Sequence, residues 1–189
     1  MPTIKASDFN GDLSDFLKDY KYQQKLTPKL DDLEGVKLSP ELVNEIVLWK
    51  VNRYVLLDVD QLHRLDTVAT LKPGEHRKAL AILEELLGVP GVDLPMASTF
   101  LRFRNPSVFQ IIDGHVYRAV YGEKYPFRPS GSKKTFGDKN KKIVAYFDYL
   151  DKLIELCNRK TLTFGTVDRL LYKFDKQEND KLKGTEPDT

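Results

Sequence analysis

The hydrophobic positions of the chain recur mostly with the spacing of an α-helix. Within residues 39–57, Leu42, Ile46 and Trp49 lie three or four positions apart, which places their side chains on one helical face. A Ser-Pro pair at residues 39–40 supplies a typical N-cap followed by proline at the first helical position. The pattern therefore predicts a helix over residues 39–57.

The same spacing predicts six further helices, separated by turn residues such as Pro73-Gly74 and Asn105-Pro106. Residues 107–112 are expected to be extended, and no two segments form a convincing strand pair. We therefore expect an all-α fold with seven or more helices. The further six cover residues 60–71, 75–88, 94–104, 113–121, 139–159 and 163–177.

The domain organisation follows from length and apolar content. With 189 residues, 41% of them apolar, the chain can bury one core or two small lobes that share a core. We expect a single two-lobed domain over residues 1–177. Residues 39–88 with part of the following helices form one lobe, and 1–38 and 123–177 pack with the lobe that holds 89–98. Residues 178–189 are expected to be a polar tail.

Composition and charge limit the kinds of binding site and partner that we expect for the chain. A net charge of +2 does not by itself indicate nucleic-acid binding, so a basic surface would need local clustering. The single cysteine, Cys157, excludes an internal disulfide and a thiolate-ligated cluster or zinc finger. We expect no cofactor and no metal. No apolar run approaches the roughly 20 residues of a membrane span, and no signal peptide is evident, so we expect a cytoplasmic protein without membrane contact, associated with the nucleoid if bacterial.

A tight turn, 89-VPGVD-93, joins two of the predicted helices. Such a Pro-Gly turn is typical of a simple corner between two helices of a bundle. The helix after it also begins with backbone N–H groups that have no partner within the helix. These groups can bind a phosphate oxygen without a basic side chain, so the turn is also a candidate for holding a nucleic-acid backbone.

This turn and a second motif together resemble a known family. VPGVD is followed by the small pair Ala97-Ser98 and then by 111-IIDGHVYRAV-120. The combination resembles the helix-hairpin-helix superfamily of DNA glycosylases, over roughly residues 39–122 and more loosely over 160–176. The positions that match its closing motif are Asp113, His115, Val116 and Arg118.

The resemblance implies a two-lobed helical enzyme that lacks a cysteine-bound cluster and acts as a monomer on double-stranded DNA. Such an enzyme flips out a modified or damaged base and hydrolyses its N-glycosidic bond. The base is left open among alkylated, oxidised, deaminated and hypermodified bases, including those of phage genomes. The resemblance also implies that the hairpin contacts the DNA backbone. The hairpin residues concerned are Val89, Gly91, Val92, Asp93, Ala97 and Ser98.

Asp113 is the candidate catalytic residue. A carboxylate held against the sugar stabilises the positive charge that develops as the base departs, and it can orient or deprotonate the attacking water. An acid at the start of a helix is equally typical of an N-cap, and position alone does not separate the two roles. The motif and the hairpin upstream favour catalysis.

Two residues depart from the family's pattern. Pro95 stands where members that also cut the DNA backbone carry a lysine, and proline has no amine to attack the sugar. We therefore expect base removal that leaves an abasic site, without strand cleavage; a lysine elsewhere in the chain that supplies the amine is the alternative. Asp93 replaces the second glycine of the turn and brings a negative charge near the expected phosphate. A DNA-binding module without activity, or a helical protein-interaction domain, are the alternatives.

Further candidates surround this motif. His115, Tyr117 and Arg118 are expected to support Asp113, and for Arg118 a structural ion pair is favoured over a DNA contact. Base-pocket or wedge candidates from the helix at 39–57 are Trp49, Asn52, Arg53 and Tyr54. For Trp49, the alternative of a core position is favoured over the wedge role.

The segment 124–142 is rich in basic residues with interleaved aromatics. It follows the predicted helix at 113–121 directly, which favours phosphate contacts over the alternative of a solvated linker. The candidates for DNA contact are Lys133, Lys134, Lys139, Lys141 and Lys142.

Overall fold

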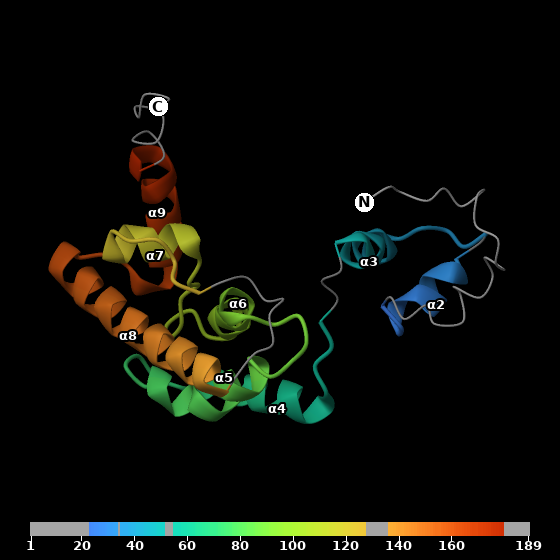
Figure 1. Ribbon diagram of the computed structural model, residues 1–189, viewed down its shortest axis with the longest axis horizontal. Helices are drawn as coiled ribbons and strands as arrows, with labels where there is room; N and C mark the ends of the chain where they lie inside the picture. Colours follow the sequence, from blue (N-terminus) through green and yellow to red (C-terminus); the bar gives the residue numbers. More distant parts are fainter. Residues whose placement is uncertain (1–22, 34, 52–54, 128–135, 180–189) are drawn as a thin grey trace, which may run out of the picture. The chain divides into compact units, whose positions relative to one another are not determined.

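The computed structural model describes residues 23–33, 35–51, 55–127 and 136–179, and every regular element in these ranges is helical (Figure 1). The expected all-α class is therefore confirmed for the described residues. The chain divides into an N-terminal unit, Met1–Tyr54, and a C-terminal unit, Val55–Thr189. This division falls within the segment 39–88.

The N-terminal unit contains α2 (Leu26–Asp31) and α3 (Pro40–Lys50). Ser39 caps α3, because its hydroxyl accepts a hydrogen bond from the Leu42 N–H at 3.3 Å. Two contacts join the helices: Trp49 Nε1 donates to Thr27 Oγ1 at 2.9 Å, and Lys29 binds Glu45 at 2.6 Å. The helix α2 was not expected from the sequence.

The helix predicted over residues 39–57 was too long. α3 ends at Lys50, and residues 55–58 are not helical. Asp58 explains the break, since it has extended backbone angles and forms a capping box with Gln61 that starts the next helix, α4 (Val59–Thr67). The helical spacing of apolar residues therefore runs past the end of α3 and does not mark where that helix stops.

The next two predicted helices each contain a 3₁₀ turn. α4 continues into η2 (Val68–Thr70), and η3 (His76–Ala79) precedes α5 (Leu80–Leu86). Asn105 closes the bend between them, because its side-chain amide donates to Val68 O and Leu71 O, both at 2.9 Å. The tightened turns satisfy terminal backbone groups that a short helix leaves unpaired.

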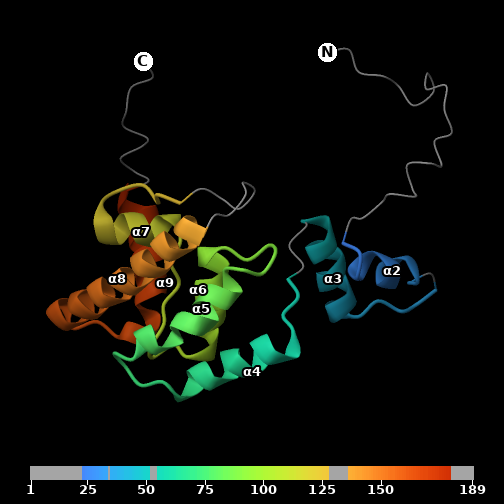
Figure 2. The same cartoon turned by 60° about the horizontal axis from the view of Figure 1, so that its bottom comes forward.

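The remaining helices follow the sequence pattern closely. They are α6 (Leu94–Arg104), α7 (Gly114–Tyr121), α8 (Phe136–Lys160), η4 (Phe164–Thr166), α9 (Val167–Phe174) and the π-helical turn η5 (Asp175–Asn179). The long helix α8 starts three residues before the expected position 139. It packs against α5 and α7, as the two views of the ribbon agree (Figures 1 and 2).

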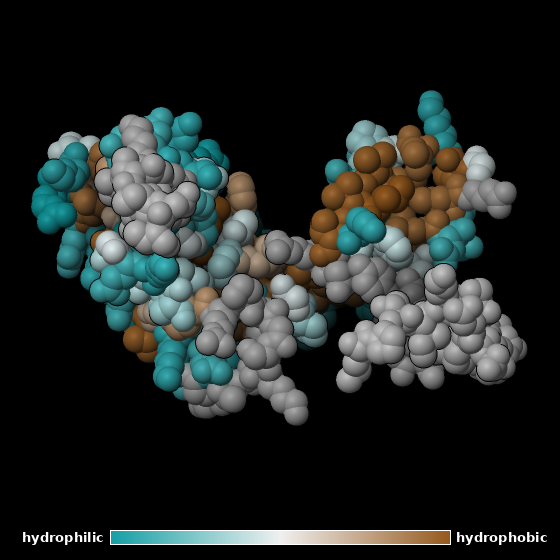
Figure 3. All heavy atoms as spheres, turned by 45° about the horizontal axis from the view of Figure 1, so that its top comes forward, coloured by the Kyte–Doolittle hydropathy of each residue, from teal (hydrophilic) through white to brown (hydrophobic). Residues whose placement is uncertain are grey.

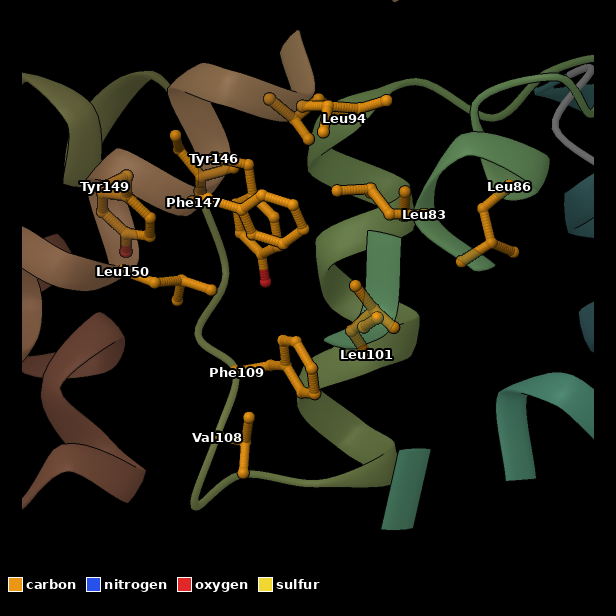
Figure 4. Packing of buried hydrophobic residues seen from close by; sticks show 14 of the residues in the cluster. Leu83, Leu86, Leu94, Leu101, Val108, Phe109, Tyr146, Phe147, Tyr149 and Leu150 are labelled. Carbon is orange, nitrogen blue, oxygen red and sulfur yellow. The ribbon is translucent and has the colours of Figure 1, made fainter. Parts of the chain in front are cut away.

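The core of the C-terminal unit lies between α5, α6, α8 and the extended segment before α7 (Figure 4). Four of the fully buried side chains there are Leu83, Leu101, Phe109 and Leu150. Burial of each such side chain stabilises the folded state by roughly 1.5–3 kcal/mol relative to leaving it exposed. Tyr146 is also buried, and its hydroxyl donates to Gln110 O at 3.0 Å. The core is therefore apolar but also holds the backbone of the extended segment.

A buried ion pair attaches α9 to α6. Arg102 lies 3.4 Å from the carboxylate of Asp168 and donates to Gly165 O at 3.0 Å. Both charged side chains are almost fully buried, so each depends on the other to offset its loss of hydration.

Among the described residues, no helix combines the length and apolar character needed to cross a bilayer.

We expect Asn105→Ala to lower the free energy of unfolding by about 1–3 kcal/mol, because it removes two hydrogen bonds to buried carbonyls. Urea unfolding followed by circular dichroism measures the change. Asn158→Ala, at an exposed position of α8, is the matched control and should alter stability by less than about 0.5 kcal/mol. Equal effects of the two substitutions would contradict the bridging role of Asn105.

Candidate functional site

Asp113 is the N-cap of α7. Its backbone is extended, and its Oδ1 accepts hydrogen bonds from the His115 and Val116 N–H groups, both at 2.8 Å. The capping interpretation is therefore confirmed. Both capping bonds use the same oxygen, so Oδ2 takes no part in them. The side chain is half-buried, which leaves part of the carboxylate accessible.

Two hydroxyl groups fix the backbone just before Asp113. The Tyr149 hydroxyl donates to Ile111 O at 2.6 Å. The Ser98 hydroxyl accepts from the Ile112 N–H at 3.2 Å and donates to Pro95 O at 2.9 Å. Ser98 therefore links the first turn of α6 directly to the segment that carries Asp113.

The turn between α5 and α6 has the conformation that its sequence predicts. Gly91 has φ +82°, a left-handed conformation that glycine adopts without steric cost. The Val92 N–H donates to Val89 O at 3.1 Å and closes the turn. Asp93 caps α6, because its Oδ1 accepts from the Leu94 N–H at 2.8 Å. Pro90 and Gly91 form the exposed tip.

The hairpin side chains face the interior. Val89, Val92, Ala97 and Ser98 are all buried. A ligand at this hairpin would therefore meet backbone at the exposed tip rather than these side chains. The Ser98 hydroxyl, already engaged with Ile112 and Pro95, serves the fold.

Lys142 neutralises the acid of the turn. Its Nζ lies 2.6 Å from Asp93 Oδ1, and both side chains are largely buried, at 11% and 15% exposure. The same ammonium lies 5.9 Å from the centre of the Phe127 ring. The sequence suggested a repulsive charge at Asp93 and a phosphate contact at Lys142, and the structure pairs the two instead.

The other lysines differ in their surroundings. A methyl group added to Gly88 would come within 3.2 Å of Lys139 Nζ, so this ammonium lies beside the C-terminal end of α5. A cation there is favoured by the helix dipole. Lys141 is exposed to solvent. Lys133 and Lys134 lie outside the described residues.

Arg118 and His115 bind a residue that the sequence did not single out. Asp175, in η5, is fully buried. It accepts hydrogen bonds from Arg118 Nε at 2.7 Å, Arg118 Nη2 at 2.5 Å, His115 Nδ1 at 2.7 Å and Asn179 Nδ2 at 2.6 Å. The favoured interpretation of Arg118 as part of a structural ion pair is confirmed. The His115 side chain binds Asp175, and only its backbone N–H contacts Asp113.

The groups bonded to Asp175 lower the pKa of its carboxyl group. Burial alone would raise the pKa of Asp175, but the hydrogen bonds from Arg118, Asn179 and His115 outweigh it and hold the pKa well below the usual carboxyl range. The carboxylate therefore stays charged and fastens α7 to the end of α9. Asp175 and Arg118 are 57 positions apart in the chain, so no local sequence pattern predicts that they pair.

Aromatic side chains continue from α7 toward the hairpin. Tyr117 stacks on Tyr121 at 4.3 Å and contacts Tyr125 edge-on at 5.6 Å, and Tyr125 in turn contacts Phe127 at 5.4 Å. Burial raises the pKa of Tyr125, and the carboxylates of Asp93 and Asp113 raise it further. The Tyr125 hydroxyl thus stays protonated within the electrostatic field of both acids.

The wedge candidates belong to the N-terminal unit. Trp49 is half-buried, and its indole N–H is bonded to Thr27, which agrees with the alternative that Trp49 packs within that unit. Asn52, Arg53 and Tyr54 lie outside the described residues. No group of three or more metal-ligating side chains comes together within the described ranges.

The arrangement around Asp113 suits the stabilisation of a positive charge. It offers a half-exposed carboxylate, fixed by backbone bonds on one oxygen, next to a hairpin whose own acid is already paired. Comparison with known proteins adds no assignment: no protein family, curated protein or solved structure matches the chain.

Replacing Asp175 should destabilise the protein in a pH-dependent way. We expect Asp175→Asn to lower the free energy of unfolding at pH 7 by on the order of 3 kcal/mol, because Arg118 loses its buried partner. The folded-state pKa is depressed, so the stabilisation is present above the ordinary carboxyl value of 3.8 and declines as the pH falls below it. Urea unfolding at pH 7 and at pH 3 measures both effects.

The exposed ion pair of Asp148 with Arg77 provides the control for Asp175. Asp148→Asn should change stability by less than about 1 kcal/mol. If the difference between wild type and Asp175→Asn were the same at pH 3 as at pH 7, the depressed pKa would be wrong.

Proposed function

We propose that the protein is a monofunctional DNA glycosylase of the helix-hairpin-helix type, with Asp113 as its catalytic residue. One observation supports the proposal most strongly. The Ser98 hydroxyl connects the second hairpin helix to the Asp113 segment, so a DNA backbone held at the hairpin would lie at a fixed distance from the acid. A glycosylase needs this fixed relation between backbone grip and reacting sugar.

In the proposed reaction, the modified nucleotide leaves the duplex and its sugar meets the Asp113 carboxylate. The bond between C1′ and the base nitrogen breaks, and its electron pair leaves with the base. Asp113 Oδ2 stabilises the resulting oxocarbenium ion. A water oxygen then attacks C1′ as its proton passes to the carboxylate, which gives an abasic site and the free base after protonation of the base.

The proposed partner is double-stranded DNA that contains a modified base. Its backbone would meet the exposed tip at Pro90 and Gly91 and the start of α6. The pairing of Asp93 with Lys142 removes the repulsion that an isolated acid would cause at this point. Phosphate contacts by Lys141, Lys133 and Lys134 remain part of the proposal and would make binding sensitive to salt.

A second candidate is a DNA-binding module without activity. The observation that favours it is the capping role of Asp113, since two backbone hydrogen bonds account for an acid at this position. Such a module would bind duplex DNA in a salt-dependent way and release no base.

Asp113→Asn tests the catalytic role directly. Asparagine keeps a side-chain oxygen for the cap but lacks the negative charge, so we expect base release to fall by about 100-fold or more while duplex binding is retained. Mass spectrometry of bases released from diverse genomic and phage DNAs measures the activity and identifies the base. Asp148→Asn, at an exposed position of α8, is the control and should leave release unchanged. Failure of the wild type to release any base would favour the binding module.

The protein should not form a covalent adduct with abasic DNA. Pro95 cannot attack the sugar, and the Lys142 side chain is engaged by Asp93 at 2.6 Å, so borohydride treatment in the presence of an abasic duplex should trap no complex. Gel electrophoresis detects the adduct if it forms. A trapped complex would overturn the monofunctional assignment, and its loss in Lys142→Met would identify the responsible amine.

A further inference from the structure

Four aromatic side chains beside α7 contact one another, and we call them the aromatic cluster: Tyr117, Tyr121, Tyr125 and Phe127. Asp113, Tyr117 and Tyr121 are each four positions apart, so their side chains lie on one side of α7. A methyl carbon added to Gly114 would come within 4.0 Å of Tyr125 Cβ, so Tyr125 lies beside the first residue of α7. The aromatic cluster therefore begins next to the candidate catalytic carboxylate.

The side chains of the aromatic cluster are all half-buried. Continuous hydrophobic surface lies instead on the N-terminal unit, where Val43 and Val47 of α3 are 45% and 54% exposed, and the face of the C-terminal unit seen in the same view is mainly hydrophilic (Figure 3). Half-buried aromatic side chains beside a few polar groups are typical of small-ligand sites. A nucleobase is a ligand that stacks on aromatic rings.

Other polar side chains around Asp113 are already committed to the fold. They bind backbone carbonyls of the segments 95 and 110–111, or the carboxylates of Asp93 and Asp175. These side chains are Ser98, His115, Arg118, Lys142, Tyr146 and Tyr149. Recognition of a base beside Asp113 therefore needs a further donor.

Tyr125 supplies such a donor. Its hydroxyl oxygen is buried and has no hydrogen-bond partner among the described residues. A buried hydroxyl without a partner destabilises the folded state, and native structures keep few of them. Burial and the carboxylates of Asp93 and Asp113 raise the pKa of this hydroxyl, so it keeps its hydrogen at neutral pH.

On the basis of the proposed glycosylase function, we propose that the Tyr125 hydroxyl donates a hydrogen bond to the departing base and is a second catalytic residue beside Asp113. The acceptors of a base that lie closest to its glycosidic nitrogen are O2 in pyrimidines and N3 in purines. A donor beside the acid that meets C1′ would reach one of these two atoms.

The hydrogen bond would act on the leaving group. As the bond between C1′ and the base nitrogen breaks, its electron pair moves onto the base, and the Tyr125 hydroxyl stabilises the negative charge that develops there. The hydroxyl keeps its own proton throughout, and the departed base takes a proton from the solvent. Asp113 stabilises the positive charge on the sugar, so the two residues act on opposite sides of the breaking bond.

The segment that carries Tyr125 leaves room for the base to enter. The helix α7 ends at Gly122, which has a left-handed φ of +73°, and residues 122–127 form no helix or strand. Rotation of the Tyr125 side chain would uncover its hydroxyl without a change in α7. Side-chain rotamer changes of this kind are common when partners bind.

Tyr125→Phe tests the contact, because it removes the hydroxyl and keeps the ring. The probes are synthetic duplexes that each contain one uncharged base, either uracil, hypoxanthine, 8-oxoguanine or 5-hydroxymethylcytosine, or the cationic base N7-methylguanine. Release of each uncharged base that the wild type excises should fall by about 10- to 100-fold. Release of N7-methylguanine should change by less than about threefold, because this base departs as a neutral molecule and develops no negative charge.

Stability separates this role from a structural one. The urea midpoint of Tyr125→Phe should stay the same or rise, because the substitution removes a buried hydroxyl that has no partner among the described residues. Tyr121→Phe, in the same cluster, is the matched control and should leave base release unchanged. A loss of release together with a lower midpoint would identify the hydroxyl as structural and overturn the proposal.

The outcomes for base release distinguish this proposal from the proposed function. Equal release of uncharged bases by the wild type and Tyr125→Phe would overturn the role of Tyr125 alone. A wild type that releases only N7-methylguanine would also overturn it, because such a base departs without the help of a donor. A wild type that releases no base would overturn both the role of Tyr125 and the glycosylase function.

Discussion

The C-terminal unit depends on how one extended stretch of buried backbone, residues 110–113, finds its hydrogen bonds. Buried peptide groups without partners would cost about 1–3 kcal/mol each, and no strand lies beside this stretch within the described ranges. Three side-chain hydroxyls form the hydrogen bonds that a neighbouring strand would otherwise provide. They belong to Tyr146 and Tyr149 from α8 and to Ser98 from α6. Because these hydroxyls come from two different helices, the stretch can satisfy its backbone only when α6 and α8 are both in place. The position of Asp113 is therefore a result of tertiary packing as much as of its own cap.

Local signals predicted the helices well, and they failed where a second local signal competed. The starts of α6 and α7 follow from Asp93 and Asp113, whose caps can be read from neighbouring residues. The end of α3 could not be predicted from period alone, because apolar residues continue at helical spacing until the capping box at Asp58 starts a new helix. The short helix α2 has no side-chain cap and therefore gives little signal in the sequence.

The candidate site was predictable only in part. Asp113 and the turn at Gly91 carry their conformational reasons within a few residues. The partners that define their surroundings do not: Lys142 is 49 positions from Asp93, and Asp175 is 57 positions from Arg118. Each of these residues has an ordinary role when considered alone, such as a solvent-exposed lysine or an acid near the end of a predicted helix. Only the three-dimensional fold pairs them, so pairwise charge compensation is the part of the site that sequence reasoning could not supply.

The π-helical turn at the end of α9 also sets how short an autonomous fragment of the protein can be. The motifs that suggested a function end near residue 122, and the regular α-helix of α9 ends at Phe174. Asp175 and Asn179 come after both boundaries. Asp175 nevertheless binds His115 and Arg118 of α7, and the Asn179 side-chain amide donates a hydrogen bond to Asp175. A fragment trimmed to the motifs, or to the last α-helical residue, would discard the anchor of the very helix that Asp113 begins. The smallest self-sufficient form of the C-terminal unit therefore extends at least through Asn179.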